Sequence, residues 1–147
     1  METKQGRGSP MRQLDPLIGT WDTRGEVVSE DGSRQTFTAT DAYWWVADGK
    51  FLYHDIVADM PGQHVVGFEI AGYDDKNDRF WIRTYDNLGN MGEQTATMIG
   101  NRWSITGNAE RFSGVFSPDN TIISGSWERP DGAKWLHWMD VTLTRRP

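Results

Sequence analysis

Residues 14–21 read Leu14-Asp15-Pro16-Leu17-Ile18-Gly19-Thr20-Trp21. Asp15 and Pro16 suit the start of a short helical turn, because an Asp side chain can cap free amides and Pro lacks an amide that the first turn leaves unbonded. After Trp21 no helical period persists, and turn-forming residues recur about every eight to twelve positions. The segment therefore predicts one helical turn that leads into an all-β domain.

Turn signals divide the rest of the chain into about ten short strands. Each turn contains Gly, Asn, Asp or Pro, which supply the positive or fixed φ angles that tight turns need. Short loops favour a meander, and a meander of this length closes into an up-and-down antiparallel barrel without exposed edges. A barrel of slightly more than eight strands has room for a ligand. The turns lie at residues 30–33, 47–50, 61–63, 74–78, 87–90, 100–101, 107–108, 117–120 and 130–133.

The composition fits one domain in a chain of 147 residues. Residues 1–12 are polar and rich in Gly, so we expect a disordered tail before a single barrel domain at 13–147. The net charge of −6 argues against a nucleic-acid partner. No apolar run approaches the ~20 residues that span a bilayer, and no secretory signal is present. We expect a soluble, cytoplasmic protein that is a monomer or a homodimer and has no membrane partner.

The absence of cysteine excludes disulfides and Cys-ligated metals, whereas eight tryptophans indicate an aromatic interior. An Asp48-Gly49 turn would place Trp45 opposite Leu52 and Tyr43 opposite His54. The hairpin at residues 100–101 would likewise pair Met98 with Trp103. These registers predict that the inward side chains include Asp41, Tyr43, Trp45, His54, Gln94, Met98, Trp103 and Trp127.

Three assignments depend on how many residues the preceding turn contains. A turn over residues 61–63 would bring Phe68 inside with Val66 and Ile70, and would leave Glu69 outside with Glu93. The strand around Trp81 can face either way. If Arg83 faces inward there, it could bind a carboxylate. In the last strand, His137 and Trp138 lie on opposite faces, and a β-bulge would reconcile the two possible phases.

The ordered set of Gly19-Thr20-Trp21, Gly72-Tyr73-Asp74, and Trp81-Ile82 leading to Asp86 and Gly89 resembles a bacterial lipocalin-like family of the calycin superfamily. More distant similarity extends to nitrobindins and fatty-acid-binding proteins. The resemblance implies a barrel in which Trp21 closes one end beneath Arg145 or Arg146. It implies a cavity without fixing one chemistry. Nitrobindins bind haem through a histidine, for which His137 is a possible counterpart.

The interior register brings together Asp41, Tyr43 and His54. Tyr43 would lie directly across from His54 and Asp41 on the diagonal, within reach of hydrogen bonds. A carboxylate would orient the imidazole, and such a group in an apolar cavity can serve as a general acid or base. A buried polar cluster that satisfies its own hydrogen bonds is the alternative interpretation. No metal site is expected, because His54, His64 and His137 lie on separate segments.

Two functions remain open. The first is a binding protein for a small hydrophobic molecule. The second is a cofactor-independent cyclase, isomerase or dehydratase of secondary metabolism that uses His54, Asp41 and Tyr43 as its catalytic groups. Haem binding is a third alternative, and no other cofactor is indicated. The side chains expected to contact the ligand are Trp45, Phe68, Gln94, Met98, Trp103, Trp127, His137 and Trp138.

Overall fold

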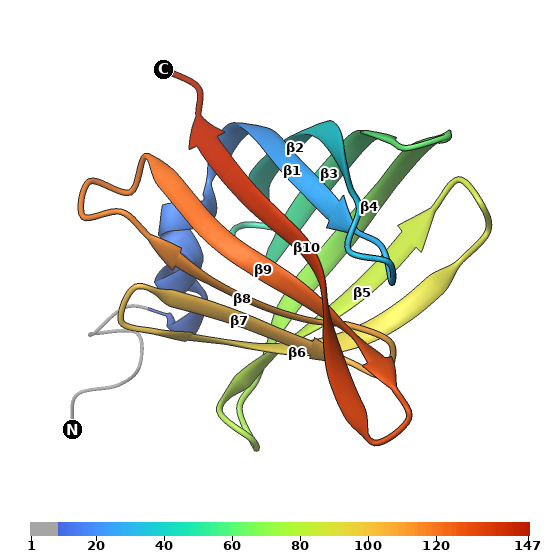
Figure 1. The fold of residues 1–147 in the computed structure, drawn as a ribbon. Helices are drawn as coiled ribbons and strands as arrows, with labels where there is room; N and C mark the ends of the chain where they lie inside the picture. Colours follow the sequence, from blue (N-terminus) through green and yellow to red (C-terminus); the bar gives the residue numbers. More distant parts are fainter. Residues whose placement is uncertain (1–8) are drawn as a thin grey trace.

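The computed structural model describes residues 9–147. One short 3-10 helix, η1, precedes ten antiparallel strands that form a closed barrel (Figure 1). The predicted ten-stranded all-β barrel with an N-terminal helical turn is confirmed. The elements are η1 (Pro10–Leu17), β1 (Gly19–Val28), β2 (Arg34–Val46), β3 (Phe51–Met60), β4 (Gln63–Asp74), β5 (Arg79–Asp86), β6 (Met91–Ile99), β7 (Arg102–Gly107), β8 (Arg111–Phe116), β9 (Ile122–Asp131) and β10 (Lys134–Arg145).

Each strand pairs with the strands before and after it in the chain, and β1 pairs with β10 to close the ring. In that closing pair Trp21 lies opposite Arg145. Successive residues of a strand point to opposite sides, so the register decides which side chains enter the interior. The β2–β3 hairpin pairs Tyr43 with His54, which confirms the register predicted from the turn between these strands.

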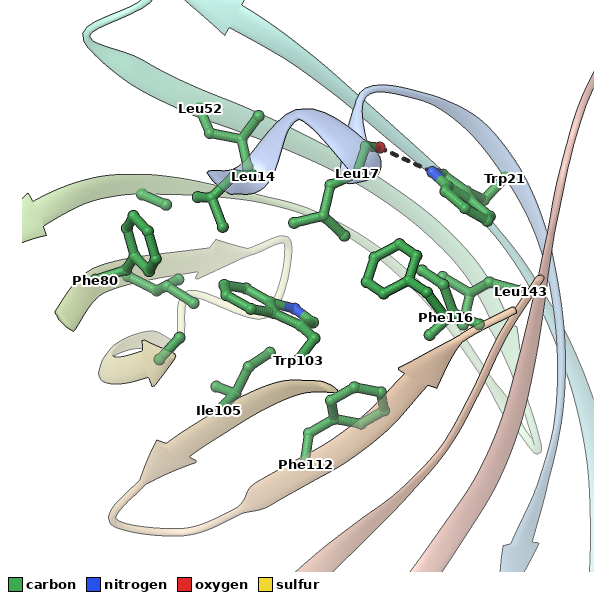
Figure 2. Packing of buried hydrophobic residues seen from close by; sticks show 14 of the residues in the cluster. Leu14, Leu17, Trp21, Leu52, Phe80, Trp103, Ile105, Phe112, Phe116 and Leu143 are labelled. Atoms are coloured by element: carbon green, nitrogen blue, oxygen red, sulfur yellow. Dashed lines mark hydrogen bonds between the residues drawn. The ribbon is translucent and has the colours of Figure 1, made fainter. Parts of the chain in front are cut away.

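Helix η1 lies at the end of the barrel where the β6–β7 and β8–β9 hairpins turn (Figure 1). Its Leu14 and Leu17 side chains are fully buried, and they pack beside Trp21 and other core residues (Figure 2). The helix begins at Pro10, earlier than the sequence suggests, and Met11 is buried. The last three residues of the expected tail therefore belong to η1, and residues 1–8 lie outside the described part of the chain.

Trp21 and Arg145 close this end. The indole Nε1 of Trp21 donates a hydrogen bond to the Leu17 carbonyl at 2.9 Å. The Arg145 guanidinium lies over the Trp21 ring, with Cζ 4.2 Å from the ring centroid, and donates to the carbonyls of Pro16 and Ile18. The basic residue that covers Trp21 is thus Arg145, whereas Arg146 forms an exposed ion pair with Asp22.

Gly19 is needed where the chain passes from η1 into β1. Its φ is +129°, a conformation that residues with a side chain rarely adopt. A Cβ at this position would also lie 2.7 Å from Nη1 of Arg145. The absence of a side chain at Gly19 therefore leaves room for the Arg145 side chain of β10 to lie over Trp21 of β1.

The structure settles both strand phases that the sequence leaves open. In β5, Phe80 and Ile82 are buried inside, whereas Trp81 and Arg83 lie together on the outer surface. In β10 a register shift between His137 and Met139 is the expected β-bulge. No helix among residues 9–147 has the length and apolar character to cross a membrane.

Candidate functional site

The barrel encloses a cavity of about 590 Å³. Leu17 closes it at the η1 end, where Leu52 at the start of β3 also packs (Figure 2). Because Met60 is at the other end of β3, the cavity extends along the barrel away from η1 toward the β3–β4 hairpin. Most of its wall is apolar, and it includes the aromatic side chains of Phe37, Trp103, Phe112, Trp127 and Trp138.

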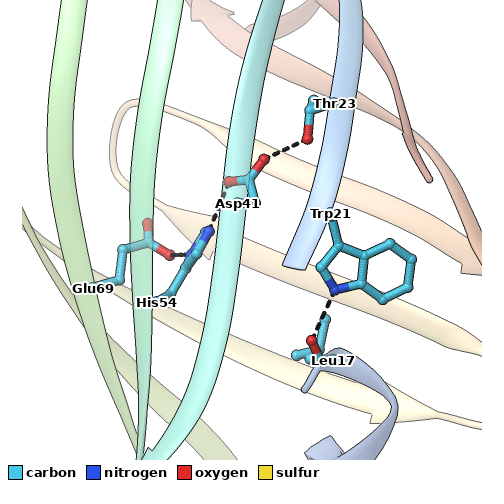
Figure 3. Close-up of polar contacts among 6 residues, drawn as sticks. All are labelled: Leu17, Trp21, Thr23, Asp41, His54 and Glu69. Atoms are coloured by element: carbon cyan, nitrogen blue, oxygen red, sulfur yellow. Dashed lines mark hydrogen bonds and ion pairs between the residues drawn. The ribbon is translucent and has the colours of Figure 1, made fainter. Parts of the chain in front are cut away.

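A row of four polar side chains interrupts this apolar wall on β1, β2, β3 and β4 (Figure 3). Thr23 donates its hydroxyl to Asp41 Oδ2 at 2.5 Å. Asp41 Oδ1 is 2.7 Å from His54 Nε2, and His54 Nδ1 is 2.8 Å from Glu69 Oε1. We call Thr23, Asp41, His54 and Glu69 the polar row. It connects four consecutive strands through side chains alone.

His54 is held between two carboxylates. Burial lowers the pKa of His54, but Glu69 and Asp41 more than offset this effect and raise it to about 9. Both ring nitrogens point at carboxylate oxygens, which is the geometry of an imidazolium that donates two hydrogen bonds. At neutral pH His54 is therefore the cation of the polar row, held between the two acidic side chains.

The aromatic ring of Tyr43 lies against one face of the His54 imidazole. The two rings stack with centroids 3.9 Å apart and planes 13° from parallel. Burial, together with the negative charges of Asp41 and Glu69, raises the pKa of Tyr43 well above its usual value. The phenol therefore stays neutral. Among residues 9–147 its hydroxyl has no hydrogen-bond partner, so it remains available as a donor in the cavity wall.

A family described as "Protein of unknown function (DUF1579)" matches residues 7–109. The chain belongs to this family. The match ends before β8, yet β8, β9 and β10 complete the same closed barrel. All four residues of the polar row lie within residues 7–109, the part of the chain that the DUF1579 family matches.

The DUF1579 fold also occurs in a crystal structure of Rv2717c from M. tuberculosis. The two chains superpose with a TM-score of 0.69 at 12% identity, over 95% of this chain and 99% of the other. At this identity the similarity concerns the fold alone, and it fits the calycin-like barrel that the sequence resembles. No curated protein matches the chain.

Several residues that sequence analysis selected do line the cavity of this DUF1579 protein. They are Asp41, Tyr43, His54, Trp103, Trp127 and Trp138. Trp45 and Met98 face the interior and pack, partly buried, against the core, but they lie outside the cavity wall.

Gln94 is buried, as expected, but it lies away from the cavity. Its Nε2 donates to Glu110 at 2.6 Å. Its Oε1 is buried and has no hydrogen-bond partner within residues 9–147.

Two expected ligand contacts are wrong. Phe68 lies on the outer surface, stacked between Tyr53 and Tyr85, because the β3–β4 turn contains two residues rather than three. His137 is exposed and pairs with Asp140 at 3.1 Å, because the β10 bulge turns Trp138 and Met139 inward and leaves His137 outside.

The expectation that Glu69 lies on the outer face is also wrong. Met60 pairs with Gln63, so Glu69 lies directly opposite His54 and faces the cavity. The signal was Pro61-Gly62, a pair suited to positions i+1 and i+2 of a two-residue turn, and Gly62 has the positive φ of +72° that such a turn requires. Thr23, which sequence analysis did not select, reaches Asp41 diagonally from β1.

The geometry does not favour acid–base catalysis by His54. A general base needs a free lone pair, and both ring nitrogens of His54 are already hydrogen-bonded. Neither His64 nor His137 is among the described residues that line the cavity, and both are exposed and paired with Asp59 and Asp140. Among residues 9–147 no group of three or more acidic or histidine side chains is arranged to hold a metal ion.

Proposed function

We propose that this protein binds a small, mainly apolar molecule inside the barrel. The observation that carries the proposal is the cavity of about 590 Å³ with an apolar and aromatic wall. Ligand sites commonly have volumes of ~300–1,000 Å³ and combine such walls with a few polar groups that orient the ligand. The family membership and the calycin-like fold are compatible with this function, and the lipocalin-like character of the sequence points the same way.

Packing explains why the cavity persists. Trp21 and η1 close one end, and the hydrogen-bonded ring of strands holds the walls apart. The side chains of the polar row bond to one another from β1 to β4, which leaves the rest of the cavity wall for a ligand. A ligand would therefore replace empty or water-filled space rather than displace core side chains, so little of the binding free energy would be lost to rearrangement.

The test uses N-phenyl-1-naphthylamine, an uncharged dye whose fluorescence rises in apolar surroundings. We expect saturable binding with one dye per chain, displaced by 1-decanol. Ala58 is buried and lines the cavity, so Ala58→Trp should fill space and weaken dye binding at least tenfold. The matched control is Val57→Trp, because Val57 is the next residue and points outward with 39% exposure. Its dye affinity should be unchanged.

Circular dichroism establishes that each variant is folded. If Ala58→Trp does not fold, Ala39→Trp supplies a second bulky side chain in the same cavity wall. The proposal is overturned if the wild-type protein does not bind the dye, or if a folded cavity-filling variant binds it as tightly as the wild-type protein does.

A further inference from the structure

The charges in the cavity wall do not balance. The acidic and basic side chains in it are Asp41, His54 and Glu69, and no lysine or arginine is among the described residues that line it. One imidazolium between two carboxylates leaves one net negative charge. The carboxylates are largely withdrawn from solvent, since the side chains of Asp41 and Glu69 are 12% and 18% exposed. Charges in such surroundings interact more strongly than they do in water.

One carboxylate oxygen remains unused. Both oxygens of Asp41 accept hydrogen bonds, from His54 and Thr23. Glu69 accepts from His54 through Oε1 only, and its Oε2 accepts no hydrogen bond from any residue between 9 and 147 (Figure 3). The Tyr43 hydroxyl is likewise without a partner in this part of the chain and lies in the same wall. The cavity therefore offers a charged acceptor and a neutral phenol to its occupant.

Aromatic side chains add to this preference. Trp103, Trp127 and Trp138 are part of the cavity wall, and the faces of such rings attract cations. A carboxylate ligand would meet the opposite situation. It would bring a second uncompensated negative charge into the cavity, where the described part of the wall holds no guanidinium or ammonium group to pair with it.

We propose that the cavity selects an apolar molecule bearing a protonated amine, which donates to Glu69 Oε2, and that it discriminates against fatty acids. This inference rests on the proposed function and names its ligand class. An ammonium group would bring the polar row and its ligand to zero net charge. The Tyr43 hydroxyl can act as donor or acceptor for a second polar group of the same ligand.

The test compares three probes with the same chain: decylamine, 1-decanol and decanoate, each displacing N-phenyl-1-naphthylamine at pH 7. We expect decylamine to bind at least tenfold more tightly than decanol, and decanoate to bind more weakly than decanol. In Glu69→Gln the affinity for decylamine should fall to near that of decanol, while decanol affinity is retained. Retained decanol binding also shows that the variant is folded.

The matched control is Glu93→Gln, which removes the same charge from the outer surface, where the Glu93 side chain is 82% exposed. This variant should keep the wild-type order of affinities. The inference is overturned if decylamine binds no better than decanol, or if Glu69→Gln leaves their ratio unchanged. In either case binding of decanol would leave the proposed function standing, whereas failure of all three probes and the dye would remove both.

Discussion

Arg145 lies over the ring of Trp21 and binds the carbonyls of Pro16 and Ile18, so one side chain joins the last strand, the first strand and the end of η1. Its Nε also donates to the Asn120 carbonyl at 3.1 Å. Contacts to Trp21 and to three separate carbonyls are far more than an exposed arginine makes. The stability of the barrel at its η1 end should therefore depend on this residue.

We expect Arg145→Met to lower the free energy of unfolding by about 1–3 kcal/mol, because several hydrogen bonds from a charged donor are lost. Urea denaturation at pH 7 measures the change. Arg146→Met is the control, since the Arg146 guanidinium forms an exposed ion pair with Asp22, and such pairs contribute little. Equal effects of the two substitutions would contradict this role of Arg145.

Gly19→Ala should destabilise the protein by about 1–3 kcal/mol through backbone strain at φ +129°, and further through the contact with Arg145. The comparison is Gly49→Ala, in the β2–β3 turn. Gly49 also has a positive φ, +77°, but a Cβ there meets no atom of residues 9–147 within 4 Å. Gly49→Ala should lower the free energy of unfolding by about 1 kcal/mol. A thermal or urea denaturation series decides the order. The explanation fails if Gly19→Ala is the milder change.

Thr23→Val removes the hydroxyl that donates to Asp41 Oδ2 and leaves that oxygen without its partner. A buried acceptor deprived of its donor costs about 1–3 kcal/mol, so we expect a loss of stability in this range. Thr38→Val, on the outer face of β2, makes the same chemical change at an exposed position. Thr38→Val should have little effect in the same urea experiment. A loss of stability comparable to that of Thr23→Val would contradict a specific contribution of the Thr23–Asp41 hydrogen bond.

His54 should make stability depend on pH. Its pKa is raised from 6.5 to about 9 in the folded protein, so its contribution is complete below about pH 6.5 and is lost as the pH rises through 9. The free energy of unfolding should fall by up to about 3 kcal/mol over this window. His54→Gln should flatten the fall, whereas His64→Gln, at an exposed histidine, should keep it. Denaturation curves from pH 6 to pH 10 test this, and an unchanged slope in His54→Gln would contradict it.

Sequence reasoning succeeded where a hairpin fixes its own register. The turn after β2 allowed Tyr43 to be placed opposite His54, and the structure has this pair. It failed for β4, where counting one residue too many in the turn exchanged the two faces and moved Phe68 in and Glu69 out. The alternation of side chains makes such a one-residue error change every residue of the strand.

The bulge in β10 shows a different limit. The apolar pattern of that strand supports both phases, and the structure uses both, one on each side of the bulge near Trp138. Where a bulge falls depends on packing with the neighbouring strand, which a single sequence does not reveal. The polar row was similarly hidden in part, because it crosses four strands and needs every register between β1 and β4 to be right.

The closed ring of strands also bears on how the chain folds. All pairings but one join neighbouring strands, whose loops are short and cost little entropy to close. The exception joins β1 to β10, and it brings together the two ends of the domain. We expect this pairing to form late. Arg145 and Trp21 would then act as a latch, and loosening it would speed unfolding while leaving the folding rate nearly unchanged.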